Sequence, residues 1–502
     1  MRRTIRYALA LAATVFLLSA LAFCIAAGHG PAGNLARFQS ILSSKGFQCN
    51  QGTVAFPDWI GMGCACELPS CWGNNPSSTY GAYVLPPAPG QTALNPWAEA
   101  FSTAEQPNWS CFWRLRPDEA IVFIGQTPPT MTYFGFVSYL FDRAGTPPAN
   151  PACSPRPPSV ANRAPEVFSS LHDTLNPLTI KTAWGRGQPF AKATIIITAA
   201  DKGTAAAVRS ALLRAGYPDS IINLDVIPSA IVKLGIDQAA DSFQSVIRLS
   251  PLDPTAQAVH DYMANPGTVW RVTPTIVTPA DQLDPLPVPR LRVRGTGHTE
   301  LDLLPAVEEL RQAILDVYAD DYDYLEIPSV DFMEGYSALQ ANENALGDNR
   351  DTVFLVNGPF TSPDVPYLLG EDEFIVVYGV NHAATGKATY SNFAVTGGKL
   401  NVGAGSVRSE FFPGSAEDYL PHSTITPKLY AWTIRRQQTG PGAGGPLAIH
   451  CLEIGSDCEQ AGIPVDEPLR VVFRAYLEKA TRVGPAYPEL VHDRTIKFTP
   501  KP

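Results

Sequence analysis

Proline is the feature of this sequence that most limits its fold. The chain of 502 residues contains 47 prolines, which is about 9% against a usual ~5%. Because proline fixes φ and lacks a backbone donor, it interrupts helices and central strands. Helix bundles and coiled coils are therefore disfavoured, and much of the chain is expected in loops, turns and strand edges.

The overall composition excludes two further classes of protein. Hydrophobic residues make up 45% of the chain and charged residues only 17%, which is unlike a disordered chain. The formal net charge is −10, whereas a protein that binds the phosphate backbone needs a basic face. We therefore expect a globular protein of roughly two to four domains that binds no nucleic acid.

The N-terminus has the pattern of an export signal. Arg2, Arg3 and Arg6 precede an apolar run at residues 7–27, and such a basic-then-apolar order directs export. Residues 1–27 are therefore predicted to be a signal peptide or, because the apolar run is long enough to cross a bilayer, an uncleaved N-terminal anchor. Cys24 makes a lipoprotein the third alternative. Membrane contact is expected only through this segment, and the mature chain should be secreted, periplasmic or part of the cell envelope.

The cysteines point to the same compartment. An even number of cysteines in an exported chain indicates disulfides, and beyond Cys24 there are eight: Cys49, Cys64, Cys66, Cys71, Cys111, Cys153, Cys451 and Cys458. Their clustering along the chain predicts that the first six pair among themselves and that the last two pair with each other. The alternative is a metal site at the closely spaced cysteines 64, 66 and 71, which only partly match the spacing of zinc ligands.

Shifts in composition divide the rest of the chain into three parts. Residues 28–160 are rich in cysteine and proline and read as β structure, residues 161–290 as an α/β region, and residues 291–502 as a helix followed by a β-rich domain. The predicted fold class is therefore α+β, or mixed, with β-rich N-terminal and C-terminal parts on either side of an α/β middle segment.

The middle segment contains one β-α-β unit that can be recognised from the sequence. Residues 193–199 form a β-branched run, typical of a strand that is buried on both faces. Residues 204–213 are rich in alanine and leucine and predict a helix, and residues 221–227 predict a second strand. A strand, helix and strand in this order predict a parallel pair joined by a crossover helix.

Apolar periodicity predicts most of the other elements. Helices are expected at about 254–263 and at 299–320, the latter with apolar residues at spacings of three and four. Strands are expected at 111–116, 120–125, 132–140, 352–356, 373–380, 388–395, 428–433, 447–454 and 470–477.

No motif of a known reaction is present. The sequence lacks the G-x-S-x-G nucleophile elbow, the H-E-x-x-H zinc helix and the G-x-x-x-x-G-K-[ST] phosphate loop. Candidate sites must therefore be argued from clusters of polar residues.

The first candidate site is the segment from Tyr378 to Tyr390, where one apolar strand gives way to the next. His382 can titrate near neutral pH, and Tyr378, Lys387 and Tyr390 can donate protons or bind an oxyanion. Catalytic groups are expected on loops that rigid elements hold in place. These four residues are therefore the predicted catalytic group, with Asn381 as a substrate contact. The alternative is a surface hairpin whose polar tip is only solvated.

The second candidate site is a short strand that carries Arg290, Arg292 and Arg294 on one face. Guanidinium forks suit the recognition of carboxylate or phosphate. If the fold brings this strand to His382, we expect Arg292 and Arg294 to hold the anionic part of a substrate. The alternative is an exposed strand whose arginines pair with some of the 47 acidic residues.

The third candidate site is acidic, and it lies at the end of the long predicted helix. A hard cation needs about six to eight oxygen ligands, and exported proteins often use calcium, so a calcium site is one interpretation of this cluster: Asp316, Asp320, Asp321, Asp323 and Glu326. No other cofactor is predicted. The alternative is a solvated helix end, although acids there oppose the helix macrodipole.

Three classes of function remain. The first is an exported enzyme that uses His/Tyr/Lys acid–base chemistry on a small or polymeric polar or anionic substrate. The second is a non-catalytic extracytoplasmic ligand-binding or cell-envelope protein, and the third is a structural or interaction module. Convergence of His382 and the arginines in one concave pocket would favour the enzyme, and their dispersal would favour the binding protein.

Overall fold

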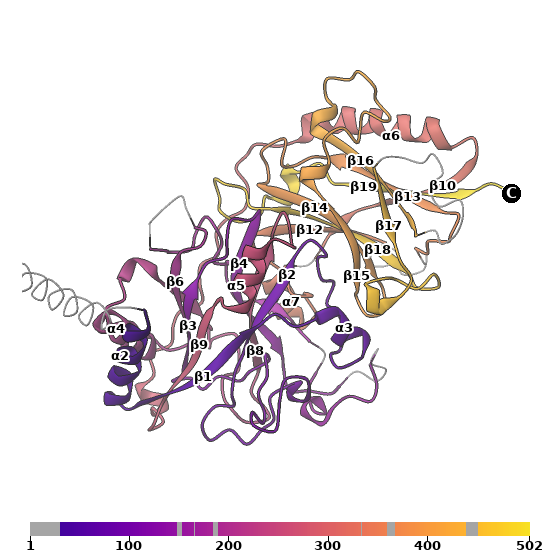
Figure 1. Ribbon diagram of the computed structural model, residues 1–502. Helices are drawn as coiled ribbons and strands as arrows, with labels where there is room; N and C mark the ends of the chain where they lie inside the picture. The colour runs from indigo at the N-terminus through magenta and orange to yellow at the C-terminus, as the bar shows by residue number, and fades with distance from the viewer. Residues whose placement is uncertain are drawn as a thin grey trace, which may run out of the picture.

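The protein consists of two lobes, which Figure 1 shows in the computed structural model. The structure describes residues 31–147, 153–164, 166–183, 189–332, 334–358, 367–437 and 450–502, so the predicted export segment lies outside the described residues. The chain is 20% helical and 32% strand, with several sheets, and the predicted α+β class is confirmed. Within the described ranges, no helix is long and apolar enough to cross a membrane.

The first half of the chain forms one nine-stranded sheet, which together with its helices makes the N-terminal lobe. The strand order is β5-β4-β8-β2-β1-β9-β3-β6-β7. Strands from the predicted 28–160 and 161–290 regions alternate in this order, so both regions share one sheet. The strands are β1 (Phe47–Ala55), β2 (Thr79–Val84), β3 (Ala120–Gln126), β4 (Tyr133–Asp142), β5 (Ser169–Ser170), β6 (Ala193–Ala199), β7 (Ile222–Val226), β8 (Ser242–Ser250) and β9 (Gly267–Pro274).

The predicted β-α-β unit is confirmed at one edge of this sheet. Strands β6 and β7 run parallel and are joined through α4 (Lys202–Ala215). The carboxylate of Asp201 caps the helix by accepting from the N–H of Thr204 at 2.7 Å. Gly216 ends the helix with a φ of +103°, a conformation that favours glycine. Helix α2 (Pro31–Ser44) packs beside α4 over the same face of the sheet, where both bury apolar side chains.

Two shorter helices complete the lobe. Helix α3 (Trp59–Cys64) follows β1, and its first turn is capped by Asp58, which accepts from the N–H of Gly61 at 3.0 Å. Helix α5 (Gln257–Ala264) precedes β9 and lies close to the predicted range of 254–263.

The second half of the chain forms the C-terminal lobe, a sandwich of two five-stranded sheets. The outer sheet has the order β10-β19-β13-β16-β17, and the inner sheet has the order β11-β12-β18-β14-β15. The strands are β10 (Tyr322–Pro328), β11 (Val330–Asp331), β12 (Thr352–Asn357), β13 (Phe374–Val380), β14 (Tyr390–Gly397), β15 (Gly403–Arg408), β16 (Leu429–Arg436), β17 (Cys451–Ile454), β18 (Leu469–Tyr476) and β19 (Arg494–Pro500).

The apolar run of β13 is explained by burial on both faces. Phe374, Val376 and Tyr378 pack against α6 (Leu304–Tyr318), which covers the outer sheet. Ile375 and Val377 face the opposite way, into the core between the two sheets. Because successive side chains of a strand point to opposite faces, a strand with a helix on one side and a sheet on the other must be apolar throughout. Figure 1 shows α6 on the far side of the sandwich from the N-terminal lobe.

The inner sheet faces the N-terminal lobe across a large contact. Its outward-pointing side chains include Asn392, whose Nδ2 donates to Oδ1 of Asn75 at 2.7 Å, and Tyr476, whose ring centroid lies 4.8 Å from that of Tyr133. Helix α7 (Gly335–Ala341) belongs to the second half of the sequence but buries Leu339 in the core of the N-terminal lobe. The two lobes are therefore interlocked.

Three expected elements differ from what the structure shows. Residues 111–116 form only isolated bridges, through Trp113 and Leu115. The arginine segment at 290–294 has no regular secondary structure and belongs to none of the sheets described above. Most of the acidic stretch after α6 is β10, in which Glu326 pairs with Arg311.

Candidate functional site

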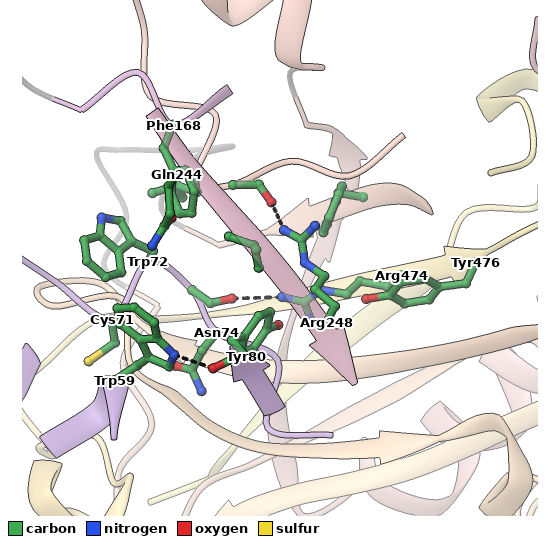
Figure 2. A pocket seen from close by; sticks show the side chains of 15 residues that line it. Trp59, Cys71, Trp72, Asn74, Tyr80, Phe168, Gln244, Arg248, Arg474 and Tyr476 are labelled. Carbon is green, nitrogen blue, oxygen red and sulfur yellow. Dashed lines mark hydrogen bonds between the residues drawn. The ribbon is translucent and has the colours of Figure 1, made fainter. Parts of the chain in front are cut away.

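The candidate site is a cavity between the two lobes, which we call the inner cavity. It holds about 630 Å³, including the part that is open to solvent. Strand β18 supplies Arg474 and Tyr476, and β12 supplies Phe354. The N-terminal lobe supplies the opposite wall, which contains Trp59, Trp72, Tyr80, Phe168, Gln244 and Arg248. Figure 2 shows Arg248 and Arg474 entering this cavity from the two lobes.

The alternation of buried and outward-facing side chains along β18 explains why an arginine points into the inner cavity. Leu469, Val471 and Phe473 are buried in the core of the sandwich. The intervening residues, which include Arg470 and Arg474, must therefore face the N-terminal lobe. The strand itself was predicted at 470–477, and the even spacing of the two arginines was the available signal for a cationic face.

Arg474 is buried, and none of the acidic residues in the described ranges pairs with it. Only 5% of the residue is exposed. Its Nη2 donates to the backbone oxygen of Gly73 at 3.1 Å, and its Cζ lies 5.6 Å from the ring centroid of Phe354. Its Nη1 has no hydrogen-bond partner, and within the described residues the guanidinium forms no ion pair.

The opposite wall contributes two more polar atoms that lack partners. Gln244 is 2% exposed and Trp72 is 8% exposed. Within the part of the chain that is described, Oε1 of Gln244 and Nε1 of Trp72 have no hydrogen-bond partner. Buried polar atoms are usually paired, so the unpaired acceptor of Gln244 and the unpaired donors of Trp72 and Arg474 are the groups of this lining that a ligand could bond.

Arg248 fixes the second guanidinium of the cavity. It donates to the hydroxyl of Tyr139 and to the backbone oxygen of Gly347, and its Cζ lies 5.8 Å from the ring centroid of Tyr80. The groups that accept its hydrogen bonds are neutral, but the buried carboxyl of Asp348 also interacts electrostatically with its charge. This wall was missed at the sequence level, because β8 was not predicted and its residues are distant in sequence from β18.

His382, the predicted acid–base residue, is buried away from the inner cavity. Its Nδ1 lies 2.8 Å from Oε2 of Glu300 and its Nε2 lies 3.4 Å from Oδ2 of Asp493. Burial alone would lower the pKa of His382, but the two carboxylates outweigh burial and raise that pKa to about 10. The imidazole is therefore held protonated through neutral pH, and its acid–base role stays a prediction.

The other predicted catalytic residues lie in different surroundings. Tyr378 packs under α6, and burial raises its pKa to about 12. Tyr390 belongs to the inner sheet, where its ring stacks on Tyr476 with centroids 5.0 Å apart. Lys387 donates to Oε1 of Glu478 at 2.7 Å and to Oε2 of Glu489 at 2.5 Å. The two tyrosines thus belong to separate sheets.

Asn381 stabilises the turn that carries His382. Its Oδ1 accepts from the N–H of Ala383 at 3.2 Å and from that of Ala384 at 3.3 Å. The carbonyl and N–H groups of this turn thus have local partners. A substrate contact at Asn381 stays a prediction.

The predicted substrate-binding arginines already have acidic partners. Arg292 Nη1 lies 3.4 Å from Oδ2 of Asp173, and Arg294 Nε lies 2.7 Å from Oε1 of Glu334. The chain that follows them does reach the first candidate site, since Nζ of Lys387 donates to the backbone oxygen of His298 at 2.9 Å. A role of Arg292 and Arg294 in substrate binding stays a prediction.

The prediction of disulfides is confirmed, but the predicted pairing holds for only one of the two bonds: Cys66–Cys153 lies within the first six cysteines, whereas Cys458 pairs with Cys64 and not with Cys451. Cys64 is joined to Cys458, with Cα atoms 5.9 Å apart, and Cys66 is joined to Cys153. The reason is spatial, because α3 of the N-terminal lobe lies against the short helix Cys458–Gln460 of the other lobe. Four of the eight cysteines that were predicted to form disulfides are free in the described part of the chain: Cys49, Cys71, Cys111 and Cys451.

The expected acidic cluster does not form a metal site. In the described ranges, no group of three or more histidine, cysteine, aspartate or glutamate side chains could hold a metal ion. The acidic residues are spread along the end of α6 and along β10, where successive side chains point to opposite faces. The calcium alternative therefore lacks a ligand set here.

Comparison with known proteins identifies no family. No protein-family model matches the chain, and no curated protein matches it. Among solved structures, the chain is similar to one described as a putative uncharacterized protein from Burkholderia cenocepacia. That structure is 11% identical in sequence, with a TM-score of 0.35, over 92% of this chain and 87% of the other.

Proposed function

We propose that this protein binds a small anionic molecule, with an aromatic or apolar body, in the inner cavity between its lobes. The observation that carries this proposal is the buried guanidinium of Arg474, which has no acidic partner among the described residues. An uncompensated buried charge is strongly unfavourable. A bound carboxylate or phosphate would neutralise it and would accept charge-assisted hydrogen bonds from its unpaired Nη1.

The walls of the cavity support an aromatic or apolar body for the ligand. Trp59, Trp72, Tyr80 and Phe168 line it together with Phe354, and aromatic side chains provide large contact areas for such groups. Ligand sites are commonly found at the interface between two domains, with few polar groups among apolar walls. The unpaired Oε1 of Gln244 would accept a hydrogen bond from a hydroxyl or amine of the ligand.

The same lining favours binding over catalysis. No carboxylate and no imidazole lines the inner cavity among the described residues, although acid–base chemistry needs such groups within hydrogen-bond reach. Cys71 is the one thiol there, and burial raises its pKa to about 12. A thiol with that pKa is a poor nucleophile because it is rarely ionised.

We further propose that the protein works outside the cytoplasm, as a secreted, periplasmic or envelope protein. The support is the pair of disulfides, Cys64–Cys458 and Cys66–Cys153, because stable disulfides belong mainly to oxidising compartments. The basic and apolar pattern of residues 1–27 agrees with export.

The test compares benzoate with benzyl alcohol, which have similar bodies but differ in charge. Titration calorimetry, or the fluorescence of Trp59 and Trp72, should report binding of benzoate and little binding of the alcohol. Because a hydrogen bond to a charged group contributes about 1.5–3 kcal/mol, Arg474→Gln should weaken benzoate binding at least tenfold.

The matched control is Arg435→Gln, which removes an arginine paired with Glu453 in the outer sheet. This variant should bind benzoate as the parent does. Equal binding of acid and alcohol, or equal affinity of the Arg474→Gln variant and the parent, would contradict the proposal.

A further inference from the structure

The inner cavity continues into two more cavities along the inner sheet. The middle cavity shares Trp72, Leu346 and Arg474 with the inner one. The outer cavity shares Leu346 and Val356 with the middle one, and it widens to about 1960 Å³ including its open side. The three cavities therefore form one cleft, which begins at the aromatic wall and opens to solvent.

Three valines form an apolar row across the floor of this cleft, which we call the valine row. The strand register places Val330 of β11 directly opposite Val356 of β12, and Val356 directly opposite Val472 of β18. Residues directly opposite each other in neighbouring strands point to the same face, so the three side chains lie side by side. Val472 lines the middle cavity, Val356 the middle and outer cavities, and Val330 the outer one. Because neighbouring strands are about 4.8 Å apart, the row is about 10 Å long.

The valine row begins beside Arg474 and ends at solvent. Val472 precedes Arg474 by two positions on β18, so both side chains face the N-terminal lobe. Val356 and Val472 are buried, whereas Val330 is 43% exposed. Val330 belongs to β11, which is an edge strand of the inner sheet. An apolar chain that starts at Arg474 therefore has a path over the row to the open side.

Leu346 provides a fixed apolar wall along the same path. It lines all three cavities. The N–H of Ala345 donates to the backbone oxygen of Val167, and the N–H of Gly347 donates to that of Phe168, both at 2.9 Å. The backbone is thus held on both sides of Leu346, so its side chain keeps its place beside the valine row.

The charges of the outer cavity do not favour a second anion. Basic and acidic side chains balance there: Lys399, Arg470, Asp331 and Glu343. Glu467 also interacts electrostatically with Arg470. A rim with both signs of charge is suited to water, so the ligand is expected to carry its anionic group at the inner end of the cleft.

We infer that the ligand is an amphipathic anion with one alkyl chain, whose anionic group binds at Arg474 and whose chain lies over Val472 and Val356 toward Val330. This inference rests on the proposed function, since Arg474 holds the anion in both. It specifies the apolar body as a chain that leaves the inner cavity. A compact anion such as benzoate would fill only the inner cavity and would gain nothing from the valine row.

The experiment measures the affinities of a series of straight-chain alkanoates by titration calorimetry, at concentrations below micelle formation. From butanoate to octanoate, the affinity should rise about two- to fourfold with each methylene that is buried. It should level off once the chain reaches the open side of the cleft. Equal affinities for butanoate, octanoate and dodecanoate would overturn the inference. A parent protein that binds neither benzoate nor any alkanoate contradicts the proposed function instead.

Two substitutions that fill the middle cavity test the path of the chain. Val472→Phe and Val356→Phe should each weaken octanoate binding about tenfold or more, to near the level of butanoate, and should leave benzoate binding unchanged. The matched control is Val317→Phe, which enlarges a valine on α6 that is 55% exposed, and it should bind octanoate as the parent does. If both cavity variants keep the parent's preference for octanoate over butanoate, or if both weaken benzoate as much as octanoate, the chain does not follow the valine row.

Discussion

Nδ1 of His382 lies 2.8 Å from Oε2 of Glu300, and both side chains are buried. Glu300 precedes α6, and His382 follows β13. Asp493, the second partner of the imidazole, precedes β19 and also accepts from the hydroxyl of Tyr430 at 2.7 Å. One imidazolium thus holds together the start of the covering helix and two strands of the outer sheet.

The stability of the protein should depend on pH through this histidine. The pKa of His382 is raised from an ordinary 6.5 to about 10 in the folded protein. The stabilisation that its charged form gives is therefore fully present below pH 6.5. Between pH 6.5 and 10 the unfolded chain loses this proton while the folded chain keeps it. The free energy of unfolding should therefore fall by up to about 1.4 kcal/mol per pH unit from this group. Urea unfolding across this range measures the slope.

Glu300 sets the acidic limit of the pH range in which the protein is most stable. Burial would raise its pKa, but His382 and its hydrogen bonds hold that pKa below the ordinary 4.5. The contribution of Glu300 to the free energy of unfolding is present above pH 4.5 and is lost as the pH falls through the pKa that this carboxyl has in the folded protein.

His382→Gln leaves two buried carboxylates without a cation, so it should destabilise the fold by about 3–5 kcal/mol at pH 6. If the free energy of unfolding of His382→Gln falls with pH above 6.5 as steeply as that of the parent, another group causes the pH dependence.

Arg474 should matter little for stability. Replacement by leucine removes one hydrogen bond, but it also removes an unpaired buried donor, which costs about 1–3 kcal/mol. We expect Arg474→Leu to change the free energy of unfolding by about 1 kcal/mol or less. Arg271 is the matched contrast, because it is fully buried and its Nη1 lies 2.9 Å from Oε2 of Glu119. Arg271→Leu leaves that buried carboxylate without its cationic partner and should cost about 3–5 kcal/mol, so equal losses in the two variants would refute this prediction.

The disulfide pattern can be read directly by peptide mapping without reduction. We expect a peptide that joins Cys64 to Cys458 and another that joins Cys66 to Cys153. Burial raises the pKa of the Cys49 thiol to about 11 and that of the Cys71 thiol to about 12. Both should therefore resist alkylation at pH 8 in the native protein and react after unfolding. A peptide that joins Cys451 to Cys458 would restore the pairing predicted from chain order.

The disulfide Cys64–Cys458, which joins the two lobes, should help to position the wall of the inner cavity as well as stabilise the fold. Residues 64–74 run from Cys64 to the wall that contains Trp72 and Gly73. The double substitution Cys64→Ser and Cys458→Ser should lower stability by about 2–5 kcal/mol and should also weaken benzoate binding. Cys451→Ser, which alters a free thiol, is the control. Loss of stability without any change in benzoate affinity would mean that packing alone positions the wall.

Local patterns predicted part of the elements but not their assembly. The β-branched run of β6 and the doubly buried β13 were predicted because burial on both faces leaves a continuous apolar sequence. Strand β8 was missed because polar residues such as Gln244 and Ser245 interrupt its apolar residues. Its Gln244 and Arg248 meet Arg474 only after the two lobes associate. Contacts over such separations leave no periodic signal, and the same is true of the partner of Cys64.

The bond between Cys64 and Cys458 also has a consequence for biosynthesis. The two cysteines are separated by 394 residues, so Cys64 emerges from the ribosome long before its partner exists. Cys66 and Cys71 are close to it in sequence throughout this interval and compete for oxidation. The correct bond can form only after Cys458 has been synthesised and both lobes have met. The covalent link beside the wall of the inner cavity therefore follows the association of the lobes and does not guide it.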